Sequence, residues 1–449
     1  MLVTSYKTKK GASPMQKCAE YTVTVDKGLI ENFLINIYPD IEYQQIKGFG
    51  GAFTEAAAVT LDKLSPATRE KVMKMYFDKE DGIGYNFGRV HINSCDFSLG
   101  NYSYVDEGDE TLESFCIERD KKSIIPMIKE ALSYGDIELF ASPWSPPAYM
   151  KSSGKMNLGG RLKREYYSLW AEYYKKFIKA YESEGVKISS ITVQNEPNAE
   201  QTWDSCIYSA EEERDFVRDY LGEKMAEIGV KILFWDHNRE RIVERSSIML
   251  SDKDASKYIS GIAFHWYSGE YYEELEAFHK LYPDMDIVFS EGCCKLPKDE
   301  DGIVATAERY AHDMIGNFTN YCNSFCDWNL LLDERGGPNH VGNFHDAPIL
   351  ANTKTDELYI RDSYYYIGHF SKFIKKGARR IATSRFSEKI ETVSFKNPDE
   401  SIVCIVLNRN DFDIDATLRI AGKLINIKSE AHSITTYIFE NVQCPAEKL

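Results

Sequence analysis

"ISSITVQNEP" (residues 188–197) joins a short apolar run to an abruptly polar end. Ile191 and Val193 are typical of a buried strand, whereas Asn195 and Glu196 place an amide and a carboxylic acid where that strand stops. Glu196 is therefore either a cap for the following turn or part of a chemical site. The fold that the rest of the chain predicts decides between these two interpretations.

This pattern of an apolar run with a polar or aromatic end recurs along the middle of the chain. The eight predicted strands are residues 46–53, 85–94, 137–144, 188–197, 230–238, 261–267, 286–292 and 323–332. Segments with helical periodicity lie between them, including residues 65–78, 164–185, 209–229 and 303–318. Alternation of strand and helix over roughly 300 residues predicts an α/β protein with a (β/α)8 TIM barrel.

A doubly wound open sheet is the competing architecture. Such a sheet normally carries a glycine-rich phosphate-binding turn after its first strand, with an acidic ribose ligand further on. The corresponding turn here reads "GFGGAFTEAA" (48–57), which does not match that pattern. The barrel is therefore the favoured prediction.

The two ends of the chain differ from its middle. Residues 20–45, 391–396, 401–410, 416–420 and 432–440 alternate apolar and polar side chains. We expect both termini to form one antiparallel β-sandwich side domain. The predicted limits are 1–45 with 376–449 for the sandwich and 46–375 for the catalytic barrel.

Composition excludes several classes of partner. The net charge of −16 argues against nucleic acid, which binds proteins through cationic contacts to phosphate. It also disfavours docking on an anionic membrane surface. Aromatic residues make up 13% of the chain, which suits both a large core and the stacking of sugar rings.

The ten cysteines contain no C-x-x-C pair, so we predict neither a zinc site nor a disulfide framework, but mostly small buried side chains. The N-terminal residues lack the apolar segment of a secretory signal, and no stretch is apolar enough to span a membrane. These features predict a soluble, reduced, cytoplasmic protein. The oligomeric state stays open.

In a barrel, chemistry takes place at the carboxyl ends of the strands. Strand four ends in Asn195 and Glu196, and strand seven in Glu291. Two such acids facing each other can hydrolyse a glycosidic bond, one as a proton donor and the other as an ionised nucleophile. Retaining enzymes hold these carboxyl groups about 5–5.5 Å apart.

Polar and aromatic residues at other strand ends suit the same chemistry. Asn195 can bond a sugar hydroxyl, Trp144 and Trp328 offer rings for stacking, and Arg89 or Tyr267 can keep a carboxylate ionised. Each residue also has a structural interpretation. A single strand-end glutamate is more often solvated or salt-bridged, and His265 alone is more often a core histidine; the coincidence of acids on strands four and seven favours catalysis.

The sequence closely resembles glycoside hydrolase family 30, the glucosylceramidase family. The resemblance lies in "GFGGAFTEA", "GRVHINSCDFSLGNYSY", "ASPWSPPAYMKSSGKMNLGGRLK", "ITVQNEP", "HWY", "FSEGC" and "DWNLLLDERGGPNHVGNFHDAPI", which together span residues 46–349. It implies a retaining exo-β-glycosidase, without metal or organic cofactor, that removes terminal β-D-glucosyl units from glucosylceramide-like or other β-glucosides.

The resemblance also implies roles for individual residues. Glu196 would be the acid/base and Glu291 the nucleophile of a double displacement. The residues implied to bind the terminal sugar are Asp96, Trp144, Asn195 and Trp328, with Asn343 at the pocket rim. The residues implied to orient the acids are Arg89, His265 and Tyr267.

This sequence departs from the family pattern in three ways. His340 replaces the aromatic residue of the common "GGPNW" motif, so the family's binding of the aglycone does not carry over directly. Cys293 lies beside the second acid and predicts thiol-sensitive activity. The absence of a signal peptide predicts a bacterial, cytoplasmic enzyme for small glycosides rather than membrane lipid. The alternatives are β-xylosidase, β-fucosidase or β-1,6-glucanase activity, or a non-catalytic carbohydrate-binding barrel.

Overall fold

The structure is a computed structural model that describes residues 1–11, 14–18 and 21–442. The parts of the predicted sandwich at residues 12–13, 19–20 and 443–449 lie outside these residues. The chain divides into two compact units. One comprises Met1–Gly48, Pro297–Asn323 and Ile360–Leu449, and the other Phe49–Leu296 and Ser324–Tyr359.

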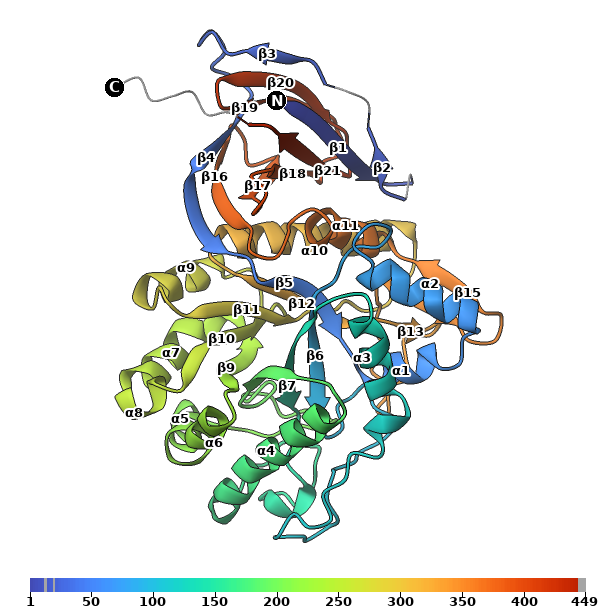
Figure 1. Cartoon of the computed structure of the whole chain (residues 1–449), viewed down its shortest axis with the longest axis vertical. Helices are drawn as coiled ribbons and strands as arrows, with labels where there is room; N and C mark the ends of the chain where they lie inside the picture. Colours follow the sequence, from blue (N-terminus) through green and yellow to red (C-terminus); the bar gives the residue numbers. More distant parts are fainter. Residues whose placement is uncertain (12–13, 19–20, 443–449) are drawn as a thin grey trace. The chain divides into compact units, whose positions relative to one another are not determined.

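Eight parallel strands close into a barrel, as predicted. They are β5 (Gly48–Ala52), β6 (Phe87–Ile92), β7 (Glu138–Pro143), β8 (Ile188–Thr192), β9 (Lys231–Asn238), β10 (Ile259–His265), β11 (Asp286–Glu291) and β12 (Ser324–Asn329). Their order around the barrel is β10-β11-β12-β5-β6-β7-β8-β9, so each lies beside its neighbours in sequence. Figure 1 shows these strands with helices around them.

The α-helices of this unit surround the strands, and the predicted segments 65–78, 164–185 and 209–229 are helical in it. The helices are α1 (Glu55–Leu61), α2 (Pro66–Phe77), α3 (Ile124–Leu132), α4 (Tyr167–Ser183), α5 (Ala210–Phe216), α6 (Gly222–Glu227), α7 (Ile242–Ser251), α8 (Lys253–Ser256) and α9 (Tyr272–Leu281). Ser65 caps α2, and Ser209 forms a capping box with Glu212 at the start of α5. The predicted helix 209–229 is divided by a π-helical turn, Val217–Leu221.

The glycines of the first strand serve packing between strands. A Cβ atom on Gly50 would lie 1.5 Å from the carbonyl oxygen of Phe87 on β6. Only glycine allows the two backbones to approach this closely. Inside the barrel, the core cluster is formed by Phe87, Phe140, Leu233, Ala263, Val288 and Cys326.

The terminal segments form a curled ten-stranded sheet. Its strands are β1 (Leu2–Lys9), β2 (Gln16–Lys17), β3 (Val23–Val25), β4 (Leu34–Gln45), β16 (Arg379–Arg385), β17 (Glu391–Lys396), β18 (Ile402–Asn408), β19 (Ile414–Ile420), β20 (Lys423–Ser429) and β21 (Ser433–Glu440). They follow the order β2-β1-β21-β18-β17-β16-β4-β19-β20-β3. All pair antiparallel except β19 with β4. A buried, mainly aliphatic cluster with members from β1, β4, β16, β18, β19, β20 and β21 forms the core, which confirms the predicted sandwich.

Two helices from the middle of the chain belong to the unit of the terminal sheet. They are α10 (Glu300–Thr319), which packs on β17, and α11 (Asp362–Ser371), which packs on β21. The predicted domain limits, 1–45 with 376–449 for the sandwich and 46–375 for the barrel, stay a prediction. A small third sheet consists of β13 (Leu332–Asp333), β14 (Ile349–Asn352) and β15 (Glu357–Ile360).

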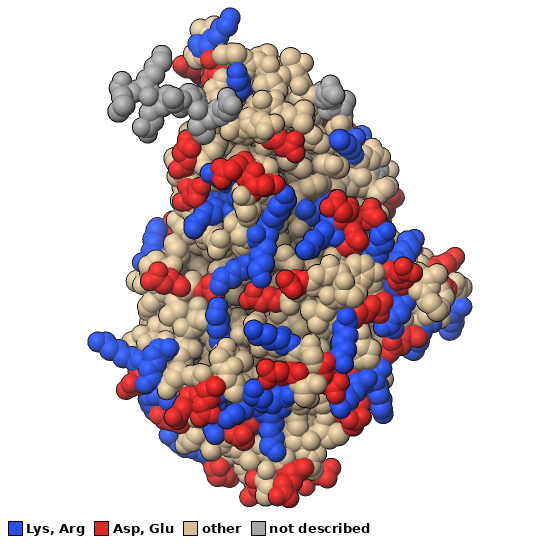
Figure 2. All heavy atoms as spheres, viewed as in Figure 1, with Lys and Arg blue, Asp and Glu red and all other residues tan. Residues whose placement is uncertain are grey.

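The surface carries both signs of charge. Figure 2 shows acidic and basic side chains interspersed over the face that it draws. No helix among the described residues is long and apolar enough to cross a bilayer. Of the nine cysteines within residues 1–11, 14–18 and 21–442, six are buried, as expected of small apolar side chains.

Candidate active site

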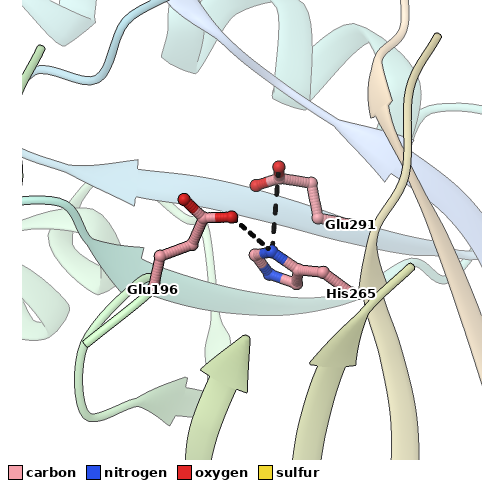
Figure 3. A group of neighbouring side chains, drawn as sticks. All are labelled: Glu196, His265 and Glu291. Carbon is pink, nitrogen blue, oxygen red and sulfur yellow. Dashed lines mark hydrogen bonds and ion pairs between the residues drawn. The ribbon is translucent and has the colours of Figure 1, made fainter. Parts of the chain in front are cut away.

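The two predicted acids lie side by side at the carboxyl end of the barrel strands. Glu291 is the last residue of β11, His265 the last of β10, and Glu196 follows β8. Figure 3 shows the carboxyl groups of both acids directed toward the His265 ring. One carboxylate oxygen of Glu196, one of Glu291 and one ring nitrogen of His265 lie within 4.8 Å of one another.

Glu196 does not cap a helix, because the next helix in the chain, α5, begins only at Ala210. Its backbone has φ +47°, in the left-handed region that a glutamate rarely adopts. The Glu196 N–H donates to the Asp236 carbonyl oxygen at 3.0 Å, and the Asn195 N–H donates to that of Pro143 at 2.9 Å. These bonds to β7 and β9 hold a strained turn that directs the carboxyl group inward.

A cavity of about 230 Å³ lies above this pair. Its lining includes Glu196, Glu291 and all five residues predicted to bind sugar, namely Asp96, Trp144, Asn195, Trp328 and Asn343. Tyr267 lines it as well, whereas Arg89 and His265 are fully buried and contact the acids from within the barrel. The barrel therefore brings all ten predicted site residues together.

Arg89 is the buried cation of the site. Its Nη1 donates to Glu291 Oε2 at 2.6 Å, and its Nη2 donates to Asp236 Oδ2 at 2.6 Å and to Asn195 Oδ1 at 3.0 Å. Its guanidinium carbon also lies 4.6 Å from the ring centroid of Trp144. One guanidinium thus contacts two carboxylates, an amide and an indole. It occupies the Asn195 Oδ1, which leaves the Asn195 Nδ2 as the donor end of that side chain.

Glu291 accepts a hydrogen bond on each carboxylate oxygen. Besides Arg89 at Oε2, the Tyr267 hydroxyl donates to Oε1 at 2.9 Å. Burial raises the pKa of Glu291, and the positive charges of His265 and Arg89 oppose that rise. Because both oxygens act as acceptors, the geometry suits the ionised carboxylate.

Glu196 shares a hydrogen-bond contact with a histidine. His265 Nδ1 lies 3.2 Å from Glu196 Oε1, and His265 Nε2 lies 3.1 Å from Asp236 Oδ1. Burial disfavours a charge on His265, but the negative charge of Glu291 and the bonds to Asp236 and Glu196 raise its pKa to about 9. Burial also disfavours the charge on Glu196 and by itself would raise its pKa. The bond from His265 outweighs burial and lowers the pKa of Glu196 to about 2. Both shifts favour a charged Glu196 beside a protonated His265.

The aromatic and polar groups around the cavity suit a sugar. Trp144 and Trp328 stack with ring centroids 5.1 Å apart. Asp96 is buried, and burial together with the charge of Glu291 raises its pKa well above the ordinary value. The Asn343 N–H donates to the Asn339 side chain, whose amide in turn contacts Asp96 at 3.4 Å.

His340 and Cys293, the two side chains that depart from the family pattern, occupy different places. His340 does not line the cavity; its Nδ1 lies 3.0 Å from the Asp96 carbonyl oxygen and its Nε2 3.5 Å from Asp204. Cys293 does line it, with Sγ 3.2 Å from the Tyr267 hydroxyl. Burial raises the pKa of the Cys293 thiol, which disfavours the reactive thiolate, and its thiol sensitivity stays a prediction.

Several residues of the site were absent from the prediction. Asp236, at the end of β9, accepts bonds from Arg89, His265, Ser290 and Thr192. The polar end of the predicted strand 230–238 carried the signal for it and for the cavity residues His237 and Asn238. The other missed cavity residues, Gln201, Trp203 and His345, lie in loops and follow no periodic pattern.

The close grouping of Glu196, His265 and Glu291 also resembles a metal-ligand set. Two observations argue against a cation there. Arg89 already contributes a positive charge 2.6 Å from Glu291, and both His265 nitrogens face carboxylates within 3.2 Å. A proton on His265 satisfies this arrangement, whereas a divalent ion would face the guanidinium and displace these bonds.

Known proteins resemble the chain over nearly its whole length. Residues 46–374 match the family model described as "Glycosyl hydrolase family 30 TIM-barrel domain", and residues 377–437 match "Glycosyl hydrolase family 30 beta sandwich domain". The chain belongs to glycosyl hydrolase family 30. It is therefore a glycoside hydrolase, and the expected resemblance is confirmed.

Individual relatives are similar to this chain in sequence and in structure over most of its length. The chain is 36% identical to "Lysosomal acid glucosylceramidase" of Mus musculus, over 90% of this chain and 83% of that protein. It matches the crystal structure of SrfJ from Salmonella typhimurium with a TM-score of 0.95 and 36% identity, covering 98% and 100% of the two chains. The endo-β1,6-glucanase BT3312 matches with a TM-score of 0.88 and 28% identity, again over 98% and 100%.

Proposed function

We propose that this protein is a retaining exo-β-glycosidase that removes terminal β-D-glucosyl units, with Glu196 as acid/base and Glu291 as nucleophile. The observation that carries the proposal is the spacing of the two acids, whose nearest oxygens lie within 4.8 Å over one cavity. Retaining enzymes hold the carboxyl groups about 5–5.5 Å apart, whereas inverting enzymes need about 6.5–9.5 Å to admit water.

The first step forms a covalent intermediate. A carboxylate oxygen of Glu291 attacks the anomeric carbon, the glycosidic bond breaks, and the departing oxygen takes the proton of Glu196. In the second step, Glu196 removes a proton from water, whose oxygen attacks the same carbon and releases Glu291. Atoms and charge balance over the two steps, and the anomeric configuration is retained.

The proton for the first step comes from the Glu196–His265 pair. His265 Nδ1 and Glu196 Oε1 are 3.2 Å apart, so the proton moves between them without diffusion. A sugar over Glu196 displaces water and disfavours its charge, which shifts the proton from His265 to the acid. His265 then remains neutral, with Nε2–H on Asp236.

The size of the cavity favours a terminal sugar. Its volume of about 230 Å³ is below the roughly 300–1,000 Å³ of sites that enclose drug-sized ligands. A glucosylceramide-like glucoside is supported by the similarity to the murine glucosylceramidase. The similarity to an endo-β1,6-glucanase favours β-1,6-linked glucosides as the second candidate.

Turnover of a panel of nitrophenyl β-glycosides tests the sugar. We expect the glucoside to have the highest kcat/KM, well above the xyloside and the fucoside. Gentiobiose and glucosylceramide then compare the two aglycone classes. Proton NMR of the first-formed product should show β-glucose; an initial α-anomer would contradict the retaining mechanism.

A further inference from the structure

The terminal sheet carries a second hollow, much larger than the candidate active site. Its volume is about 950 Å³, and it lies over β19 and β20, flanked by the segment before β4 and by the loops after β16 and β18. Buried residues such as Ile414 and Ile427 form its floor. This size falls within the range of ligand-binding pockets.

Exposed apolar side chains form the walls of this hollow. Leu29 is 82% exposed, Phe33 62% and Phe412 49%. Phe33 meets Phe386 edge to face, with ring centroids 5.4 Å apart. Single exposed apolar residues are common on protein surfaces, but a group of three phenylalanines around one hollow is typical of a binding site.

The segment that presents these side chains is held in place. Asp26 forms an ion pair with Arg419 at 2.8 Å, and Arg419 also donates to the Ile30 carbonyl oxygen. At the other end, the Thr417 N–H donates to the Phe33 carbonyl oxygen at 2.8 Å. The apolar side chains therefore face solvent from a segment that is anchored to β19 at both ends.

The backbone at Phe33 is strained. Its φ of +57° lies in the left-handed region, which is unfavourable for a bulky aromatic residue. Strain of this kind persists where the surrounding structure holds it, and it recurs at ligand-binding sites. Here it accompanies a ring that remains mostly exposed.

The polar lining restricts the chemistry of the ligand. Half of the lining residues are polar or charged, and Glu31, Asp413 and Asp415 outnumber the single cation, Lys389, whose Nζ lies over the Phe412 ring. The acidic excess disfavours phosphate, sulfate or an anionic lipid surface. A hydrocarbon chain would cover these polar groups without bonding them, at a cost in free energy.

We propose that this aromatic hollow, formed around Phe33, Phe386 and Phe412, binds a neutral glycan chain, and the choice of β-linked glucans as its ligands rests on the proposed function. Sugar rings present apolar faces to the phenylalanines and hydroxyl groups to the carboxylates and to Asn426. The site is separate from the catalytic cavity and needs no chemistry, so it does not depend on the roles of Glu196 and Glu291.

Native gel electrophoresis through soluble β-glucans tests this site. The probes are pustulan, laminarin and barley mixed-linkage glucan, and every chain carries Glu291→Gln so that no probe is consumed. We expect at least one glucan to retard the protein, and Phe33→Ala with Phe412→Ala to weaken that retardation at least fivefold. The control Tyr38→Ala changes an aromatic residue on β4 that is 43% exposed and does not line the hollow, and it should bind as before.

The outcomes separate this site from the catalytic one. With Glu291 intact, the double variant should hydrolyse nitrophenyl β-glucoside within twofold of the unmodified chain, which shows that the barrel is folded. Equal retardation of double variant and control by all three glucans overturns the proposal. The proposal is also overturned if the double variant loses only binding to phosphatidylcholine vesicles, because the occupant is then a lipid. It is likewise overturned if the variant loses only self-association in sedimentation, because the occupant is then a second copy of the chain.

Discussion

The ends of β8 and β11 each supply one acid to the same cavity, but they hold it differently. Glu291 ends a regular strand and accepts bonds from Arg89 at 2.6 Å and Tyr267 at 2.9 Å. Glu196 lies beyond its strand on strained backbone, with His265 at 3.2 Å and Gln201 at 3.4 Å. Two strong donors keep one carboxylate in one state, whereas the other has a histidine partner that can exchange a proton with it.

Asp236 connects the two halves of this arrangement. It is fully buried, and it binds both Arg89, which holds Glu291, and His265, which serves Glu196. Burial opposes its charge, but Arg89 and His265 outweigh burial and hold the pKa of Asp236 well below its usual range. The contrast between the acids therefore rests on one shared anion, Asp236, and five variants test it.

Glu291→Gln should have the largest effect. It keeps the shape of the side chain but removes the nucleophile, so we expect turnover to fall on the order of 10⁴-fold or more, even on activated glucosides. Initial rates on nitrophenyl β-glucoside measure the loss. Glu308→Gln is a matched control, since it changes a carboxyl group of similar burial (8% against 7% exposed) in the other unit. A Glu291→Gln rate near that of this control would disprove the assignment.

Glu196→Ala should be severe only where the leaving group needs a proton. We expect turnover of alkyl glucosides to fall roughly 10²–10⁴-fold, the usual range for general acid catalysis. An activated aryl glucoside should still form the intermediate, and added azide should accelerate its release as β-glucosyl azide. Absence of azide rescue, or an α-linked product, would contradict the division of roles between the acids.

His265→Gln should alter the pH dependence more than the rate at the optimum. The Glu196–His265 pair keeps its proton up to the raised His265 pKa of about 9, so the alkaline limb of kcat/KM should lie near that pH. Without His265, Glu196 alone must keep the proton, and the limb should move to lower pH. His369→Gln is the control, because His369 is a buried histidine in the unit of the terminal sheet, and burial lowers its pKa to about 3. An unmoved limb in His265→Gln would show that the pair does not share the proton.

The smallest effects should come from the outer hydrogen bonds, and they should differ between the two acids. Tyr267→Phe removes a bond to an ionised carboxylate worth about 1.5–3 kcal/mol, so kcat/KM should fall roughly 10–100-fold. Gln201→Ala removes a long, weak contact, and we expect less than about a threefold loss. Steady-state rates on one aryl glucoside compare them. Equal losses would mean that Glu291 is not held more firmly than Glu196.

Local patterns in the sequence predicted most of the fold. All eight barrel strands occur where apolar runs predicted them, and Ser65 and Ser209 begin helices because their side chains satisfy free N–H groups of the first turn. The π-helical turn inside residues 209–229 was not predictable, because helical periodicity continues across it. Nor was the parallel pairing of β19 with β4, since alternation does not state which strand lies beside which.

The candidate site also contains residues that the sequence predicted and residues that it did not. The acids Glu196 and Glu291 were found from the sequence because a barrel places its strand ends together, and the family resemblance added their roles and residues such as Asp96. Asp236 has the same strand-end signal, but only its four bonds show that it supports both acids. Gln201 and Trp203 reach the cavity through a loop whose path no local pattern records.

By itself, then, the sequence predicted the barrel, the terminal sheet and the two glutamates that meet at one cavity, because hydrophobic period and strand-end chemistry are local properties of the chain. Only the tertiary structure decided that three carboxylates surround His265 and raise its pKa, and that Phe33, Phe386 and Phe412 surround one hollow. A pKa and a pocket both depend on groups distant in sequence, and their distances and burial exist only once the chain has folded.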